Sequence, residues 1–252
     1  MSDRLRILFA GETAIVQTIE MKGYDFFSGI RFGEAWVVME KVLSGLGHEV
    51  THIPCHLVPT KFPRAQEDLA GFDVVIFSDI GSNTFLLLPE MVRTGKRLPN
   101  LLKLVRNYVE SGGGFCMIGG YMTFQGMEGK GKWKGSILEP VLPVDMIFGD
   151  DRVEVPDGVD LRCNPGDHEI LGGLPAEWPY ILGYNQTIAK PGAKVLIKAE
   201  EDPLLAVHEY GKGRAAAYTT DCAPHWAPAA MHEWEYYPLF WDNLLKWLAH
   251  RS

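Results

Sequence analysis

Short apolar runs rich in β-branched residues alternate with stretches of helical periodicity through the first half of the chain. This alternation is typical of a parallel β-sheet whose strands are joined by crossover helices. The apolar runs predict strands over residues 5–10, 49–54, 73–77 and 115–118. The last of these runs is short and entirely apolar, so we expect it to lie in the centre of the sheet with both faces buried.

Three stretches carry apolar residues at helical spacing. The first runs from residue 32 to residue 46 and is followed by Gly47, a residue type that commonly ends helices. The second, residues 99–111, begins at a proline and ends at a run of three glycines. The third, residues 234–249, closes the chain. The first two are the crossover helices that a parallel sheet requires.

The second half of the chain is less regular, because proline and glycine are dense between residues 140 and 191. Three further strands are still recognisable, over residues 194–199, 204–210 and 214–219. The turn Gly211-Lys212-Gly213 separates the last two strands and predicts that they pair as a hairpin.

Length and charge limit the classes of protein to consider. With 252 residues and 46% hydrophobic content, the chain can bury a sizeable core, and we expect one domain over residues 1–252. The net charge of -8 disfavours nucleic acid and anionic membranes as partners, since both bind concentrated basic surfaces. No stretch is ordered like a signal peptide, and no apolar run approaches the roughly 20 residues of a membrane span. The sequence therefore predicts a cytoplasmic location.

No cofactor or metal is predicted. The cysteines are widely separated, without a C-x-x-C pair, and each is interpreted as a buried or incidental thiol: Cys55, Cys116, Cys163 and Cys222. Other residues could donate to a metal, but none has the spacing of a strong motif, such as two histidines one helical turn apart. They are Glu12, His168, Asp221, Cys222 and His225.

Residues 112–121, GGGFCMIGGY, have the glycine-rich turn of a nucleophile elbow. Following strand 73–77 and the helix that begins at Pro99, this segment resembles the class I glutamine amidotransferases and the related trehalose-utilisation family. The chain is most similar to uncharacterised bacterial cytoplasmic proteins described as glutamine amidotransferase-like. Their stretches appear here as SDIGSN (78–83), IGGY (118–121), DDRVE (150–154) and DCAPHW (221–226). The resemblance implies a flavodoxin-like three-layer α/β sandwich with a mostly parallel central sheet, and implies little about activity.

In the amidotransferases a cysteine on the elbow attacks the amide carbon of glutamine. Alignment of the strand ends places Gly119 at that position, where there is no side chain. Cys116 lies three residues earlier, inside the strand, where we expect it to pack against a covering helix. His225 has a place comparable to the catalytic histidine, but Ala227 stands where the acidic partner of that histidine follows. The resemblance therefore implies the scaffold of a glutaminase with its usual catalytic residues broken.

Polar residues and glycines directly follow the predicted strands. In open parallel sheets ligands bind beyond the carboxyl ends of the strands, so these residues are the first candidates for a site. We predict that His225 transfers protons together with Glu12 or Asp221. The predicted ligand-binding residues are Asp79, Gly119, Gly120 and Tyr121, with the glycine amides forming an anion-binding turn. For the carboxylates, the alternative is a structural role as caps or turn formers.

Residues outside the strand ends add further predictions. Tyr184, Asn185 and Trp226 are predicted to bind ligand as an aromatic wall with hydrogen-bonding edges, with a role in the core as the alternative. Residues 150–154 contain a central arginine, which predicts a salt-bridged loop. His168 resembles part of a trehalose-utilisation motif, which implies a segment that folds over the site, with a surface histidine as the alternative. Exposed-looking aromatics near the C-terminus leave a homo-oligomer open.

The sequence thus predicts a glutamine amidotransferase-like protein without the nucleophile cysteine that binds or acts on a small polar metabolite at the carboxyl edge of the sheet. The trehalose-utilisation resemblance makes a carbohydrate-related compound the first choice. One alternative is a non-catalytic ligand-binding or assembly module. The other is a glutamine amidotransferase that uses a displaced cysteine, Cys116 or Cys222.

Overall fold

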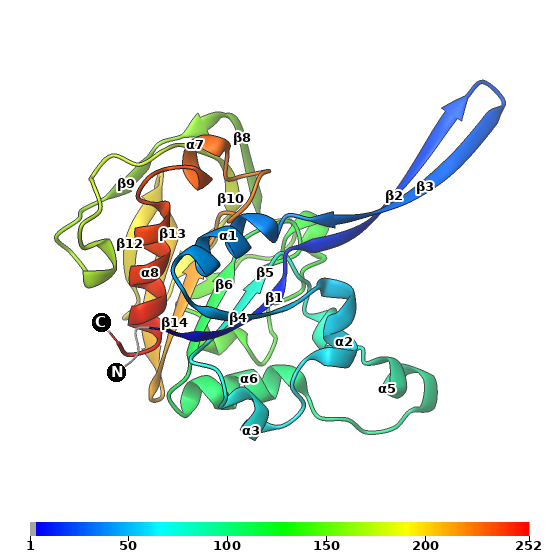
Figure 1. The fold of residues 1–252 in the computed structure, drawn as a ribbon, viewed down its shortest axis with the longest axis horizontal. Helices are drawn as coiled ribbons and strands as arrows, with labels where there is room; N and C mark the ends of the chain where they lie inside the picture. The colour runs from blue at the N-terminus through cyan, green and yellow to red at the C-terminus, as the bar shows by residue number, and fades with distance from the viewer. Residues whose placement is uncertain (1–3, 252) are drawn as a thin grey trace.

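The computed structural model describes residues 4–251 and contains one large central sheet with helices on both faces (Figure 1). The eight strands have the order β4-β1-β5-β6-β14-β13-β12-β9. Neighbours are parallel from β4 to β14, and β13, β12 and β9 are each antiparallel to the strand before them in this order. In sheet order the strands are Glu49–Ile53, Arg6–Gly11, Val74–Ser78, Gly114–Ile118, Gly213–Tyr218, Asp202–Tyr210, Lys194–Ala199 and Leu161–Cys163.

Helices cover the sheet in two layers. On one face lie α1 (Val37–Gly45) and α8 (Tyr237–Leu248), and on the other lies α6 (Leu101–Glu110) with shorter helices (Figure 1). The shorter helices on the α6 face are α2 (Val58–Lys61), α3 (Gln66–Leu69), α4 (Asn83–Leu86) and α5 (Pro89–Thr94). The short helix α7 (Ala229–His232) packs Met231 into the core under α1 and α8. This arrangement confirms the predicted α/β class and the three-layer, mostly parallel sandwich.

The apolar runs of the parallel strands follow from burial on both faces. In β1, Ile7 and Phe9 belong to the core under α1 and α8, while Leu8 and Ala10 belong to the core under α6. Alternate residues of a strand point to opposite faces, so a strand that is covered on both sides is apolar throughout. Strand β6 is buried at every residue and lies between β5 and β14, which confirms its predicted central position.

The predicted strands of the sheet agree with the structure to within two residues at each end, and the hairpin of β13 and β14 is confirmed. Two helices begin later than predicted. The helix expected from residue 32 begins at Val37, because residues 32–34 belong to a strand, and the last helix begins at Tyr237 instead of residue 234.

Sequence reasoning missed a long hairpin that follows β1. Strands β2 (Thr13–Lys22) and β3 (Asp25–Glu34) pair along ten residues each and project away from the rest of the molecule (Figure 1). They are joined by the two-residue turn Gly23-Tyr24, in which Gly23 has a φ of +67°. A glycine first in such a turn is a recognised hairpin signal, so the sequence did carry evidence for this element.

The irregular region between residues 140 and 191 also contains strands that were not predicted. Strand β10 (Ile181–Asn185) pairs with β8 (Arg152–Val159), and β11 (Thr187–Ala189) pairs with β7 (Val144–Met146). These short antiparallel pairs bring residues 151–154 and 183–185 next to the turn that follows β6.

The aromatic residues near the C-terminus are less exposed than the sequence suggested. Trp226 and Tyr237 are fully buried, and the half-buried ring of Trp234 lies 4.9 Å from the ring of Trp178. A homo-oligomer formed through these aromatics stays a prediction. Within residues 4–251, no helix has the length and apolar character needed to cross a membrane.

Candidate functional site

The carboxyl ends of four neighbouring strands gather polar side chains at one edge of the sheet. Glu12 follows β1, Asp79 follows β5, Tyr121 lies in the turn after β6, and Asp221 and His225 follow β14. Glu12 and Asp221 offer oxygens within 4.8 Å of each other, and the rings of Tyr121 and His225 are 4.0 Å apart. Parallel strands carry residues that are far apart in sequence to the same edge, which explains the gathering.

The backbone at this edge is held in uncommon conformations. Glu12, Asp79 and His225 have φ angles of +56°, +41° and +153°, values that residues with a side chain rarely adopt. Gly11 is required just before Glu12, because a Cβ atom there would lie 1.8 Å from the carbonyl oxygen of Ser78. Residues in such conformations cluster at functional sites, where packing holds them in place.

Of the two acids predicted to act with His225, Asp221 is the one in contact with its ring. Its Nδ1 lies 3.4 Å from Oδ2 of Asp221, a residue that is 4% exposed. Its ring stacks on Trp226 at 4.8 Å, with Tyr121 at its edge. Burial lowers the pKa of His225, against the opposing charge of Glu154, so the imidazole is neutral at pH 7. The acidic partner is thus four residues before the histidine, whereas the resemblance to the amidotransferases placed it two residues after the histidine.

Glu12 is a buried carboxyl group surrounded by other acids. Burial raises its pKa well above the ordinary value, and the charges of Asp221 and Asp79 raise it further. Ser78 Oγ donates a hydrogen bond to Glu12 Oε2, and the Cys222 thiol donates to the same oxygen at 3.7 Å. The pKa of Asp221 is likewise raised well above its ordinary value by burial and by Asp79. The site therefore retains protons on its carboxyl groups at a pH where exposed acids are ionised.

The raised pKa values of Glu12 and Asp221 predict a specific pH dependence of stability. Their ordinary values are 4.5 and 3.8, so above these values the folded state binds more protons than the unfolded state. Their contribution to the free energy of unfolding is complete below the ordinary values and is lost as pH rises through the raised values. We expect each group to contribute a fall of up to about 1.4 kcal/mol per pH unit in that window.

Denaturant titrations from pH 4 upwards would measure this slope. The double variant Glu12→Gln/Asp221→Asn should have a shallower slope than the wild type, because neither side chain can titrate. Glu90→Gln is the matched control, since Glu90 is a carboxylate paired with Lys96 far from the site, and its pKa is lowered by that lysine. Equal slopes in the wild type and the double variant would contradict the assignment.

Asp79 lies between two hollows at this edge. One has a volume of about 460 Å³ and is lined by Glu12, Asp79 and Pro224 among others, and the second, of about 550 Å³, is lined by Asp79, Cys55 and Met122 among others. Asp79 Oδ1 also accepts a hydrogen bond from the backbone N–H of Met122 at 2.7 Å. Asp79 therefore holds the turn after β6 and borders the space where a ligand would lie.

The predicted anion-binding turn at Gly119 and Gly120 is wrong. The Gly119 N–H donates to the carbonyl oxygen of Tyr218 at 2.7 Å, and the Gly120 N–H donates to Asn185 Oδ1 at 3.0 Å. Both amides are therefore engaged within the protein. Glycine is required at 119 because a Cβ atom there would lie 2.1 Å from the carbonyl oxygen of Thr219.

Tyr184, Asn185 and Trp226 are all buried, and each makes a polar contact within the protein. The Asn185 amide donates to Asp151 Oδ1 at 2.8 Å and to the carbonyl oxygen of Gly120 at 3.2 Å. The Tyr184 hydroxyl donates to Asp202 at 3.0 Å, and Trp226 Nε1 donates to Glu154 at 3.0 Å. These contacts give the three residues positioning roles around the site, and ligand binding by them stays a prediction.

The salt bridges predicted within residues 150–154 are present, although residues 152–154 belong to β8 and not to a loop. Arg152 donates to both carboxylate oxygens of Asp150 at 2.9 and 2.8 Å and lies 5.0 Å from the centre of the Tyr121 ring. Sequence reasoning missed the role of Asp151, which is 1% exposed and accepts hydrogen bonds from the N–H groups of Gln125 and Gly126. Asp151 thus fixes the segment after the β6 turn. Nothing in the sequence around Asp151 indicated this role, because the neighbouring Asp150 suggested only a salt bridge.

A protein-family model described as "Putative glutamine amidotransferase" (GATase1_like) matches residues 6–250. The chain belongs to this family. Among solved structures, it is 40% identical to the cytoplasmic protein STM1381 of Salmonella typhimurium LT2, with coverage of 97% of this chain and 99% of the other and a TM-score of 0.93. It is 39% identical to the cytoplasmic protein STM3548 of Salmonella typhimurium, with the same coverage and a TM-score of 0.94.

A more distant solved structure shares the fold alone with this chain. It is a ThuA-like protein of Bacteroides uniformis, 13% identical, with coverage of 97% of this chain and 91% of the other and a TM-score of 0.57. A comparison with curated proteins found no match. The family and fold that the sequence resemblance implied are therefore confirmed.

The two cysteines considered as displaced nucleophiles of this GATase1_like chain are both fully buried. Cys116 lies within β6 and packs in the core under α1 and α8, as expected. Burial raises the pKa of Cys116, and burial with the charges of Glu12 and Asp221 raises the pKa of Cys222 well above its ordinary value. Both thiols are therefore protonated at neutral pH, and a thiol is a much weaker nucleophile than a thiolate.

Three residues of the site could act together as metal ligands. Within the described part of the chain, Glu12, Asp221 and Cys222 form a group whose donor atoms all lie within 4.8 Å of one another. The mixture of two carboxylates and one thiol is compatible with a divalent transition metal. Burial raises the pKa values of all three groups, so protons and a metal would compete for this site. The sequence-based expectation of no metal stays a prediction.

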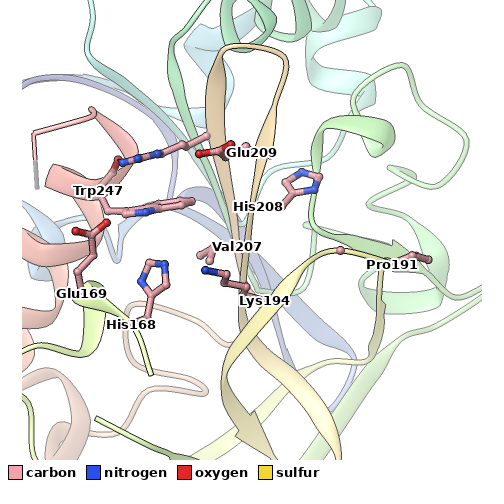
Figure 2. Close-up of a pocket in the computed structure, with 10 residues that line it drawn as sticks. His168, Glu169, Pro191, Lys194, Val207, His208, Glu209 and Trp247 are labelled. Carbon is pink, nitrogen blue, oxygen red and sulfur yellow. The ribbon is translucent and has the colours of Figure 1, made fainter. Parts of the chain in front are cut away.

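Another hollow of this GATase1_like chain, of about 580 Å³, is lined by His168, Lys194 and Trp247 among others (Figure 2). Its lining includes Arg214, near the amino end of β14, whereas the polar site lies beyond the carboxyl end of that strand. His168 lines this hollow and accepts a hydrogen bond at Nδ1 from the N–H of Ile170. Arg214 donates to the carbonyl oxygen of Trp247 at 2.7 Å and lies over the Trp247 ring, so it anchors the end of α8. The interpretation of the His168 segment as a cover over the site was wrong.

Proposed function

We propose that this GATase1_like protein acts on a small polar metabolite by general acid–base catalysis at the carboxyl edge of its sheet, without a cysteine nucleophile. The contact of 3.4 Å between His225 and Asp221, beside the buried carboxyl of Glu12, carries the proposal. A neutral imidazole can accept a proton, and a protonated carboxyl group can donate one. Neighbouring groups with opposite pKa shifts are a common arrangement for such a division of roles.

Three observations support chemistry without cysteine. Gly119 stands at the position of the amidotransferase nucleophile, and the carbonyl oxygen of Thr219 fills the space that a side chain would need there. Its N–H and that of Gly120 are engaged, so they would not stabilise the oxyanion of a glutaminase. The thiols of Cys116 and Cys222 are buried and protonated.

The class of ligand follows from the lining of the two hollows beside Asp79. The carboxyl groups of Glu12 and Asp79, the hydroxyl groups of Thr13 and Thr84 and the Asn83 amide line them and provide donors and acceptors for hydroxyl or amide groups. His225, which stacks on Trp226, directly follows Pro224, a residue that lines the smaller hollow. We propose carbohydrates and their derivatives as the first compounds to test. We also propose that the chain forms a single domain and that the protein is cytoplasmic. Two relatives described as cytoplasmic proteins support the last point.

A metabolite panel tests the proposal. Compounds that raise the melting temperature of the wild-type protein would be identified first, and their turnover would then be followed by mass spectrometry. We expect at least one stabilising compound to be converted. Stabilisation without any conversion would overturn the catalytic proposal and support a non-catalytic ligand-binding or assembly module.

The displaced-cysteine alternative makes a different prediction about glutamine. We expect no glutaminase activity, and we expect a glutamine-analogue electrophile to leave Cys116 and Cys222 unlabelled in the native protein because both thiols are buried and protonated. Labelling in urea is the positive control, since unfolding exposes both thiols. Glutamine hydrolysis together with native labelling of either cysteine would contradict our proposal.

A further inference from the structure

The β2–β3 hairpin, called the arm below, extends out of the molecule with little support of its own (Figure 1). Its two strands form a separate two-stranded sheet. At its base, Thr13 Oγ1 accepts a hydrogen bond from the N–H of Cys55 at 2.9 Å, and the Phe32 ring lies 5.2 Å from the ring of His56. An isolated two-stranded hairpin is only marginally stable in water, so the rest of an arm of this length needs further contacts.

The pairing register makes the arm amphipathic. Ile15 lies opposite Phe32, Gln17 opposite Ile30, Ile19 opposite Ser28 and Met21 opposite Phe26, and residues directly opposite each other share a face. Six of these eight side chains are large and apolar, and they define the apolar arm face: Ile15, Ile19, Met21, Phe26, Ile30 and Phe32. Each of the six is between 42% and 76% exposed.

The other face of the arm has a different character. It carries Glu20, Lys22, Asp25 and Arg31 together with small residues, and its one aromatic side chain, Phe27, lies under the Lys22 ammonium group at 5.4 Å. A polar face opposite an apolar face is the pattern of a sheet that is covered on one side. The apolar arm face is therefore suited to burial.

We propose that the apolar arm face is a self-association surface that packs against the same face of a second copy of this chain. With on the order of 200 Å² for a fully exposed side chain of this size, the six residues present roughly 750 Å². A standard protein interface buries about 800 Å² on each partner. The face therefore has the area that an isologous dimer needs.

Composition also favours a second copy as the occupant. From Ile15 to Phe32 the face contains no charged residue, and its polar side chains there, Gln17 and Ser28, are uncharged. Glu34 lies on the same face only at the base of the arm, so two outer parts of the face can pack without burying an unpaired charge. An anionic lipid surface is a poorer partner, because the chain has a net charge of -8. The arm strands also have outer edges that are unpaired within residues 4–251, which a second arm can extend.

The dimer would border the candidate site. Ile15 belongs to the apolar arm face. It also lines the hollow of about 550 Å³ whose other lining residues include Asp79, Cys55 and Met122. A second copy seated on this face would lie at the mouth of that hollow and restrict the access of water. The self-association itself does not depend on the proposed catalytic function, so either can fail without the other.

Analytical ultracentrifugation of the full chain tests the proposal. The wild type should sediment at twice the monomer mass, and the double variant Phe26→Asp/Ile30→Asp should raise the dissociation constant by roughly 100-fold or more. Phe26→Asp alone should weaken the dimer as well, and Phe27→Asp is its matched control, because it introduces one aspartate at the neighbouring position on the opposite face. It should leave the dimer intact.

Hydrogen exchange separates loss of association from loss of folding. In the double variant we expect fast exchange of the arm amides, residues 15–32, with unchanged protection of β6 and β14. A wild type that stays monomeric at high protein concentration would overturn the proposal. A dissociation constant raised as much by Phe27→Asp as by the double variant would also overturn it. If the protein is monomeric and binds anionic vesicles through the arm, the apolar arm face is a lipid-binding surface, and the self-association proposal is overturned.

Discussion

Replacement of His225 by alanine is expected to lower the turnover of any substrate identified in the metabolite panel by roughly 100- to 10,000-fold, the range typical for loss of a general base. The physical reason is that the neutral imidazole, held by Asp221 at 3.4 Å and by its stack on Trp226, is the group placed to accept a proton. Steady-state kinetics would measure the loss in kcat. Thermal shift would establish that the ligand is still bound.

Asp221→Asn should have an effect similar to that of His225→Ala. The two effects should not add in the double variant, because the acid acts through the histidine. His232→Ala is a matched control, since His232 lies seven residues later, in the short helix α7 outside the polar site. Wild-type kcat in His225→Ala would remove the imidazole from the mechanism, and an equal loss in His232→Ala would assign the effect to the fold.

Replacement of Gly119 by alanine is expected to destabilise the fold by about 3 kcal/mol or more. The added Cβ would lie 2.1 Å from the carbonyl oxygen of Thr219 and 2.8 Å from Asn185 Oδ1, so β6 or the segment after β14 would have to move. For a protein of this size, such a loss lowers the melting temperature by roughly 10 °C. Differential scanning calorimetry would measure both quantities.

Gly45→Ala is the control for Gly119→Ala. Gly45 ends α1 and is exposed, and a Cβ atom there would meet no other atom within 4 Å, so alanine should be tolerated or slightly stabilising. A Gly119→Ala variant that melts close to the wild type would show that the turn adapts to a side chain. In that case the steric requirement for glycine at residue 119 would be refuted, although residue 119 would still carry no nucleophile.

The layout of the parallel sheet was determined by the sequence because its central strands β1, β5 and β6 are buried on both faces. Because these strands are buried, β1, β5 and β6 are apolar runs that can be recognised in the sequence. Because the strands are parallel, the residues that follow them lie at the same carboxyl edge of the sheet. For this reason Glu12, Asp79, Tyr121, Asp221 and His225 could be named as neighbours before their contacts were known.

Only the tertiary structure decided which atoms meet. The pairing of His225 with Asp221, the engagement of the Gly119 and Gly120 amides, and the hydrogen bonds of Asn185 depend on the packing of segments up to 100 residues apart along the chain. The arm was missed because periodicity reports burial inside one chain, and the arm has an apolar face that this chain leaves exposed. Local patterns record which faces of an element avoid water, whereas close contacts between elements arise only when the whole chain has folded.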